Sequence, residues 1–226
     1  NTMLSTPILL DYQSSTPCSK DVVDSMKPFW NEIFSNPSSK SNLAGINASA
    51  ILEASREKIE QNLFLKNKKV IFTSGATESN NLALLGFARN HHKKTGNYGH
   101  IITLKTEHKA VLEPLHQLKK EGFMVTEITP ERDGIISEEQ FRKNIREDTF
   151  MVSIMMANNE IGVIQPIENI SKICKLRGIT FHSDFAQCLG YVELENLLSD
   201  VNMITMSSHK IYGPKGIGLL LIDQDI

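Results

Sequence analysis

The segment VIFTSGATESNNLAL (70–84) decides the fold class. Its first four residues are β-branched or aromatic, which is typical of a buried strand. Its second half enters a stretch with the apolar spacing of a helix. Only a turn of small residues separates the two, and a strand that leads directly into a helix is the repeating unit of α/β proteins.

The same alternation continues to the end of the chain. Seven strands are expected, at 70–73, 100–103, 124–128, 150–156, 179–182, 203–206 and 218–222. Helices are expected at 78–91, 109–121, 137–144 and 166–177. Glycine follows a basic last turn at three of their ends, at Gly96, Gly122 and Gly178. The sequence therefore predicts an α/β fold with a mostly parallel seven-stranded sheet and helices on both faces.

Residues 1–65 follow a different pattern. An extended arm to about Pro17 is followed by an expected helix at 21–34, a polar turn NPSSKSNLAG and an expected helix at 47–65. We assign residues 1–20 to an N-terminal arm and residues 21–226 to one large domain.

Composition indicates a folded protein that does not bind nucleic acid or membranes. Of the 226 residues, 40% are hydrophobic and 22% are charged, as in ordinary globular domains. The 24 basic and 26 acidic residues are scattered and leave a net charge of −2, which argues against nucleic acid or an anionic membrane as a partner. No apolar run approaches the roughly 18 residues of a membrane span.

Cysteine usage indicates a reducing compartment, so we expect a cytoplasmic protein. Cys18, Cys174 and Cys188 include no C-x-x-C pair, which disfavours a disulfide framework and a cysteine zinc site. The chain starts NTMLSTPILLDY, without the basic and apolar regions of a signal peptide.

Two segments have the chemistry to hold a phosphorylated aldehyde cofactor. The turn TSGAT (73–77) at a helix start could bind a phosphate through free backbone N–H groups, or be an ordinary turn capped by Ser74 or Thr77. In MITMSSHKIYGPKG (203–216), Lys210 could form a Schiff base with an aldehyde, with Ser207 and His209 donating to its phosphate. The alternative for Lys210 is a surface lysine in a glycine-rich loop.

Three further segments also follow expected strands. Asp184 in HSDFAQ needs a cationic or hydrogen-bonding partner, which could be a protonated pyridine nitrogen or the N–H groups of a following helix. A metal site formed with His182 is disfavoured, because no further ligands are evident. Asn158 and Asn159 could form a turn or offer an amide to a ligand, and His108 lies at a helix start. Because the carboxyl ends of parallel strands share one edge, a single crevice would collect all five segments.

Taken in order, TSGATESNN, KTEHKAVL, NNEIGV, HSDFAQ and SSHKIYGPKG resemble the cysteine desulfurases of the class V aminotransferase family, in particular the branch that supplies sulfur for iron-sulfur clusters. The similarity extends from LLDYQSSTP (9–17) to GIGLLLI (216–222). It implies a fold-type I pyridoxal-phosphate enzyme that converts L-cysteine to L-alanine and an enzyme persulfide. It also implies a homodimer and a partner that accepts sulfur, such as an iron-sulfur scaffold protein.

The resemblance assigns roles to ten residues. Lys210 would hold pyridoxal 5'-phosphate covalently and move protons, and His108 would stack on its ring and act in acid-base steps. Asp184 would pair with the pyridine nitrogen, and Gln187 and Asn159 would lie near the phenolic oxygen. The phosphate and its turn would involve Ala76, Thr77, Ser207, Ser208 and His209.

The sequence departs from the family pattern at two of these motifs. Phe185 places a bulky ring after Asp184, where the family has a small residue. Ser208 replaces a glycine before His209, so we expect a serine in a glycine conformation.

Relative to the family pattern, the chain stops before the C-terminal small domain, to which the family joins the N-terminal arm. That domain brings the nucleophilic cysteine and an arginine for the substrate carboxylate. None of the three cysteines here is at the matching place; Cys174 lies mid-helix and Cys188 begins a helix after Gln187, and both are expected to be buried. We therefore expect a desulfurase whose catalytic cysteine segment is absent. The alternatives are another class V pyridoxal-phosphate lyase or transaminase, or an inactive scaffold.

Overall fold

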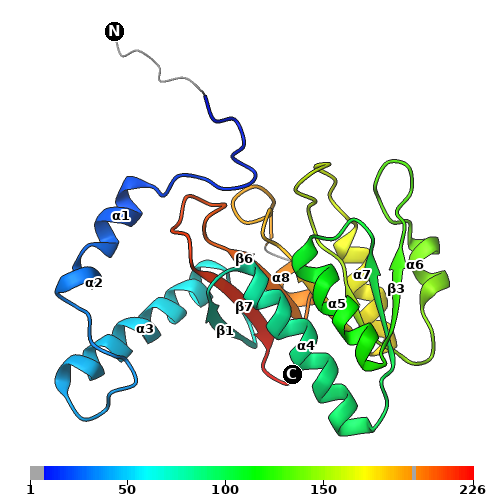
Figure 1. The fold of residues 1–226 in the computed structure, drawn as a ribbon, viewed down its shortest axis with the longest axis horizontal. Helices are drawn as coiled ribbons and strands as arrows, with labels where there is room; N and C mark the ends of the chain where they lie inside the picture. Colours follow the sequence, from blue (N-terminus) through cyan, green and yellow to red (C-terminus); the bar gives the residue numbers. More distant parts are fainter. Residues whose placement is uncertain (1–7, 195–196) are drawn as a thin grey trace.

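The computed structural model describes residues 8–194 and 197–226, and its centre is one seven-stranded sheet in the order β1-β7-β6-β5-β4-β2-β3 (Figure 1). The strands are β1 (Lys68–Thr73), β2 (His100–Leu104), β3 (Met124–Ile128), β4 (Thr149–Ser153), β5 (Thr180–Asp184), β6 (Met203–Ser207) and β7 (Gly218–Asp223). All seven expected strands are present. Strands β2 to β6 pair in parallel, and only β7 is antiparallel to its neighbours β1 and β6.

The reversal of β7 follows from its short connection to β6. Parallel neighbours need a long crossover, usually through a helix, whereas antiparallel neighbours can be joined by a loop. Residues 208–217 form such a loop, and they include the candidate lysine, Lys210.

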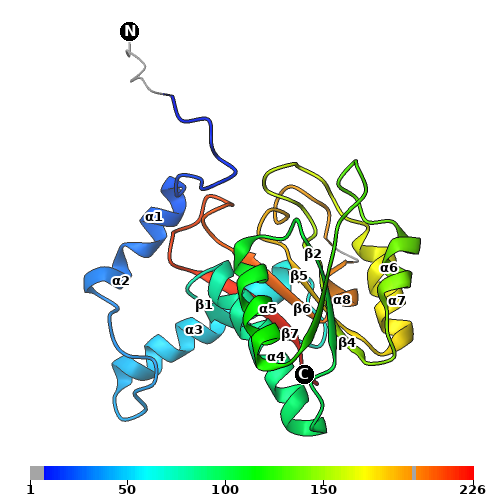
Figure 2. The same cartoon turned by 45° about the vertical axis from the view of Figure 1, so that its right-hand side comes forward.

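Helices cover both faces of the sheet, as the sequence predicts (Figures 1 and 2). On one face, α4 (Ala76–Thr95) and α5 (Lys109–Glu121) pack Leu84 and Leu115 against Ile101 of β2. On the other face lie α6 (Glu138–Asn144), α7 (Ile167–Arg177) and α8 (Leu197–Asp200). The glycines expected after α4, α5 and α7 all adopt left-handed conformations at the C-caps.

The N-terminal helices extend from the β1 side of the sheet (Figure 1). They are α1 (Lys20–Met26), α2 (Pro28–Asn31) and α3 (Leu43–Asn62). The single helix expected at 21–34 is wrong, because Pro28 lacks an N–H group and starts a new helix at its first position. The expected start of α3 at residue 47 is also late, since Asn42 Oδ1 accepts from Gly45 N at 2.8 Å and caps the helix.

Two other local expectations need correction. The strand expected at 150–156 ends at Ser153, although the N–H groups of Ile154 and Met156 still donate to carbonyls of β5. The helix expected to begin at Cys188 is a series of turns, because Gly190 adopts a left-handed conformation at φ 81°. The short helix α8 was not expected.

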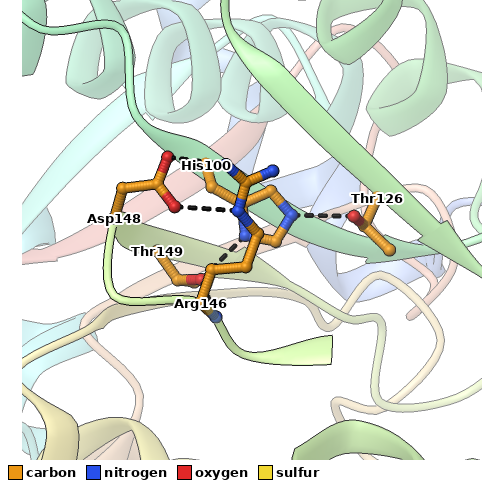
Figure 3. A network of polar contacts seen from close by, with 5 residues as sticks. All are labelled: His100, Thr126, Arg146, Asp148 and Thr149. Carbon is orange, nitrogen blue, oxygen red and sulfur yellow. Dashed lines mark hydrogen bonds and ion pairs between the residues drawn. The ribbon is translucent and has the colours of Figure 1, made fainter. Parts of the chain in front are cut away.

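A buried histidine at the amino end of β2 links this strand to its neighbours β3 and β4 (Figure 3). His100 of β2 lies 2.7 Å from Thr149 Oγ1 through Nδ1 and 2.7 Å from Thr126 Oγ1 through Nε2. The side chains of His100, Thr126 and Thr149 are therefore hydrogen-bonded to one another, away from the end of the sheet that carries the candidate site.

Residues 1–7 of the assigned N-terminal arm lie outside the described residues, and the division at residue 20 stays a prediction. Across residues 8–194 and 197–226, no helix has the length and apolar character needed to span a membrane.

Candidate active site

The carboxyl ends of the central strands surround a cavity of about 510 Å³, a size suited to a small cofactor. Eight of the ten candidate residues line it: Ala76, Thr77, His108, Asn159, Asp184, Gln187, His209 and Lys210. They come from the start of α4, the β2–α5 turn, the segment after β4, the segment 184–187 at the end of β5, and the β6–β7 loop. The fold thus brings together residues from five separate segments, while their individual roles stay predictions.

Ser207 and Ser208 do not line this cavity. Both border a neighbouring apolar cavity with Phe72 and Leu219, and Ser207 Oγ is buried without a hydrogen-bond partner among the described residues. Ser208 does not take a positive φ, so the expectation of a glycine conformation is wrong. The residue in this loop that has to be glycine for lack of space is Gly213, because an added Cβ there would lie 2.0 Å from Ser208 Oγ.

The start of α4 presents backbone N–H groups to the cavity. Its N-cap is Gly75, which has no side chain to cap the helix, so neither Ser74 nor Thr77 is the cap. Ser74 instead donates through N and Oγ to Glu78 Oε2, each at 2.6 Å. Because the first N–H groups of a helix have no intrahelical acceptor, this end can bind an anion.

Two glycines let the turn before α4 lie against the sheet. Gly75 has φ 155° and ψ −179°, a conformation open essentially only to glycine. An added Cβ at Gly218, the first residue of β7, would lie 2.7 Å from Gly75 Cα. The position of the anion-binding end of α4 therefore depends on both residues.

Asp184 is a buried carboxyl, 5% exposed, with donors on both oxygens. Asn80 Nδ2 donates to Oδ2 at 2.7 Å, and Ala186 N donates to Oδ1 at 2.8 Å. Burial raises the pKa of Asp184, while these bonds and the nearby His108 and Lys210 lower it. The bond to Ala186 closes a turn and does not cap a helix.

Lys210 is half-buried in the β6–β7 loop, and its Nζ forms no hydrogen bond or ion pair within the described part of the chain. Burial lowers the pKa of this amine, and Asp184 partly opposes the shift. A lysine whose neutral form is favoured in this way is suited to attack an aldehyde.

His108 is the N-cap of α5, one position before the helix. Its Nδ1 accepts from Ala110 N at 3.1 Å, so the neutral ring carries its proton on Nε2. The ring lines the cavity and is exposed. His108 is thus oriented to offer Nε2–H as a donor.

The two asparagines after β4 divide the roles that the sequence left open. Asn158 builds the turn, because its Nδ2 donates to Thr106 O at 2.7 Å and its Oδ1 accepts from Glu160 N and Ile161 N. Asn159 lines the cavity. Of the pair, only Asn159 is placed to offer an amide to a ligand there.

His182 is not available for a metal. Its Nδ1 lies 2.8 Å from Ser153 Oγ and its Nε2 lies 3.2 Å from Thr205 Oγ1, so both ring nitrogens are engaged inside the sheet. Complete burial lowers the pKa of His182 to about 3.

Phe185 and the cysteines also lie away from the cavity. Phe185 is fully buried in the core on the α7 face, so its ring does not narrow the site. Cys174 and Cys188 are buried as expected, and burial raises the pKa of each thiol to about 12. Half-buried Cys18 borders a separate surface pocket with Trp30 and Pro214.

Sequence reasoning missed several residues that complete the site. Ser14 and Ser15 line the cavity because the arm is tied to the β6–β7 loop, with Thr16 N donating to His209 O at 2.8 Å and Ser15 Oγ lying 3.1 Å from His209 Nδ1. Sequence reasoning also missed Asn80. Its spacing of four residues from Ala76 and from Leu84 places it on the core-facing side of the helix, where a polar residue indicates a buried hydrogen-bond partner. Ser74 and Gly75 of the expected phosphate-binding turn also line the cavity, and the other lining residues that sequence reasoning missed are Glu78, Ala110, Met155, Ala157, Ala186, Lys215 and Gly216.

Comparison with known proteins identifies the family. The profile of aminotransferase class-V matches residues 8–226. The chain is 47% identical over 216 residues to "Cysteine desulfurase IscS" of Ehrlichia chaffeensis. The aligned region covers 96% of this chain and 52% of that relative. It is 44% identical to "Cysteine desulfurase, mitochondrial" of Eremothecium gossypii, in an alignment that covers 96% of this chain and 44% of that relative.

A solved structure described as "SspA in complex with cysteine" superposes with a TM-score of 0.87 at 38% identity, covering 96% of this chain and 61% of that one. The chain thus spans about half the length of the curated relatives it matches. Because the family profile covers nearly all of the sequence, the chain belongs to the aminotransferase class-V family.

Proposed function

We propose that the chain is the cofactor-binding part of a pyridoxal-phosphate-dependent cysteine desulfurase. The observation that carries the proposal is the meeting of an unpaired lysine, a buried carboxyl and an open helix start in one cavity, in a chain about 45% identical to proteins named cysteine desulfurase. The substrate would be L-cysteine; one solved relative is described as a complex with cysteine.

The residues of the cavity fit pyridoxal 5'-phosphate. Its aldehyde requires an amine, and Lys210 Nζ is unengaged in the described structure. Its pyridine nitrogen requires a carboxylate, and Asp184 is buried with two neutral donors but no ion pair there. Its phosphate requires N–H donors, which the start of α4 supplies. When bound, the cofactor supplies an electron sink for bond cleavage at the amino acid.

The chain's own residues would then bind, orient and move protons. Asn80 and Ala186 N hold Asp184 in a fixed orientation toward a cationic partner. His108 presents Nε2–H, because Nδ1 is engaged by Ala110 N. Lys210, with its lowered pKa, can both bind an aldehyde and carry a proton when released.

The overall reaction would convert L-cysteine and a thiol R–SH to L-alanine and a persulfide R–S–SH. The thiolate would attack the sulfur of cysteine, breaking its carbon–sulfur bond, and a proton would replace sulfur on that carbon. No cysteine lines the cavity among the described residues, so the accepting thiol comes from elsewhere.

We also propose that the protein is a cytoplasmic homodimer that passes sulfur to an iron-sulfur scaffold or another acceptor protein. The names of its relatives support sulfur transfer. Unpaired cysteines suit a reducing compartment. The apolar side chains of Trp30 and Phe34 on and just beyond α2, 79% and 75% exposed, are suited to pack against another subunit or domain.

The test is an absorbance spectrum of the purified protein with pyridoxal phosphate, followed by borohydride reduction and peptide mapping. We expect a new visible band and cofactor fixed to Lys210. Alanine formation from L-cysteine in the presence of dithiothreitol then tests the reaction itself. Cofactor fixed to a different lysine, or none fixed, would contradict the proposal.

A further inference from the structure

Glu107 is a buried carboxyl beside the candidate active site that does not line the cavity. It is 6% exposed and precedes His108 in the β2–α5 turn. Its Oε1 accepts from Met155 N at 2.7 Å. Its Oε2 is buried and has no hydrogen-bond partner within the described residues.

The bond from Met155 connects two segments that line the cavity. The β2–α5 turn carries His108, and the segment 154–159 carries Met155, Ala157 and Asn159. A second bond, from Asn158 Nδ2 to Thr106 O, joins the same two segments. Met156 N in turn donates to Asp184 O at 3.2 Å. Glu107 therefore helps to fix His108 relative to Asp184.

The surroundings of Glu107 favour its neutral form. The side chains of segment 154–159 are uncharged, β5 contributes Asp184, and the β2–α5 turn contributes Lys105 and His108, which are both exposed. Burying an ionised carboxylate with one oxygen unpaired costs far more free energy than burying a neutral carboxylic acid. Burial and the nearby Asp184 both raise the pKa of Glu107, and burial raises it well above its usual value. Asp184 is also buried, but two hydrogen-bond donors and the nearby Lys210 oppose the rise of its pKa, so the neutral form is favoured more strongly at Glu107 than at Asp184.

We propose that Glu107 is a positioning residue that acts as a neutral carboxylic acid. It holds the turn carrying His108 against Met155 N without placing a second negative charge beside Asp184. The inference rests on the proposed function only for the roles of His108 and Asp184.

The first test is an infrared difference spectrum between the wild-type protein and Glu107→Gln at neutral pH without cofactor. We expect the wild type to show the carbonyl band of a protonated carboxylic acid, and the variant to lack it. Glu168→Gln, which removes an exposed carboxylate whose pKa is lowered by Lys172, is the control and leaves that band intact. Absence of the band from the wild type would overturn the proposal.

The second test compares cofactor affinity. Gln keeps an acceptor for Met155 N and the neutral charge, so we expect Glu107→Gln to bind pyridoxal phosphate within about twofold of the wild type. Glu107→Ala leaves Met155 N without its acceptor, and we expect binding about tenfold weaker. A Gln variant as impaired as the Ala variant would show that the charge is needed and overturn the proposal.

The third test uses stability and needs neither cofactor nor the Ala variant. Because the folded-state pKa of Glu107 is raised, the unfolded state alone loses the proton as pH rises above 4.5. The folding equilibrium constant of the wild type relative to Glu107→Gln then falls by up to about tenfold per pH unit. A pH-independent ratio would overturn the proposal. If no protein binds cofactor, the proposed function fails, while this test and the infrared test still decide the state of Glu107.

Discussion

Asn80 Nδ2 donates to Asp184 Oδ2 at 2.7 Å, joining the core-facing side of α4 to the end of β5. Both residues are buried, and they are 104 positions apart in the sequence. The bond stabilises the charged form of a carboxyl that burial would otherwise neutralise. Asn80 therefore favours the charged form of the carboxyl that would face the cofactor.

Asn80→Ala should weaken cofactor binding because Asp184 Oδ2 loses its donor and the pKa of Asp184 rises further. The lost bond to a charged group corresponds to about 1.5–3 kcal/mol. Titration with pyridoxal phosphate measures the effect. Asn81→Ala, which removes only a bond to Thr77 O, is the control. Equal affinities of the two variants would contradict the role of Asn80.

Lys210→Ala should abolish covalent attachment of the cofactor, because it removes the amine that burial makes nucleophilic. Lys215→Ala is a matched control, since Lys215 lines the same cavity. Mass spectrometry after borohydride reduction measures attachment in each. Loss of attachment in the Lys215 variant but not in the Lys210 variant would reverse the assignment.

Gly218→Ala should displace the turn before α4, because the added Cβ would lie 2.7 Å from Gly75 Cα. We expect lower affinity for pyridoxal phosphate together with lower stability. Gly86→Ala in α4 is the control, since its Cβ meets nothing within 4 Å and replacing a helical glycine stabilises by roughly 0.5–1 kcal/mol. Chemical denaturation and cofactor titration measure both properties. A Gly218→Ala protein that binds like the wild type would show that the turn tolerates the shift.

His182 should make the protein less stable as pH falls. Burial lowers its folded-state pKa to about 3 from 6.5, so between these values only the unfolded state takes up the proton. Its contribution to the free energy of unfolding falls by about 1.4 kcal/mol per pH unit below 6.5. Urea denaturation from pH 7 to 5 measures the slope, which His182→Gln should reduce. Identical slopes in wild type and His182→Gln would refute this.

Lys68 and Asp223 should prove energetically coupled where β1 meets β7. The ammonium of Lys68 is almost completely buried and donates to Asp223 and to Val201 O. Asp223→Asn leaves that charge without its counter-ion, and we expect a loss of about 3–5 kcal/mol in stability. The double variant Lys68→Met/Asp223→Asn should recover part of it. A double variant less stable than Asp223→Asn alone would rule out this explanation.

Local sequence patterns predicted the elements because each depends on neighbouring residues. The bounds of α5 at 109–121 follow from helical spacing and from Gly122, and the strands follow from β-branched runs. Errors arose where one residue overrides the pattern, as Pro28 does between α1 and α2 and Gly190 does after β5. The sequence also placed the candidate lysine, carboxyl and helix start at the carboxyl ends of strands, which is a consequence of the α/β alternation.

Local patterns in the sequence were thus enough to predict the order of the elements, the fold class and five of the segments that form the cavity, but not the contribution of the N-terminal arm. Three features depend on the packed fold: Ser207 and Ser208 lie beside another cavity, Ser15 reaches His209, and residues distant in the sequence hold the buried carboxyls. The bonds Ser15–His209, Asn80–Asp184 and Glu107–Met155 join residues 194, 104 and 48 positions apart. Such contacts depend on how the packed sheet and helices bring distant segments together, and no local spacing encodes them.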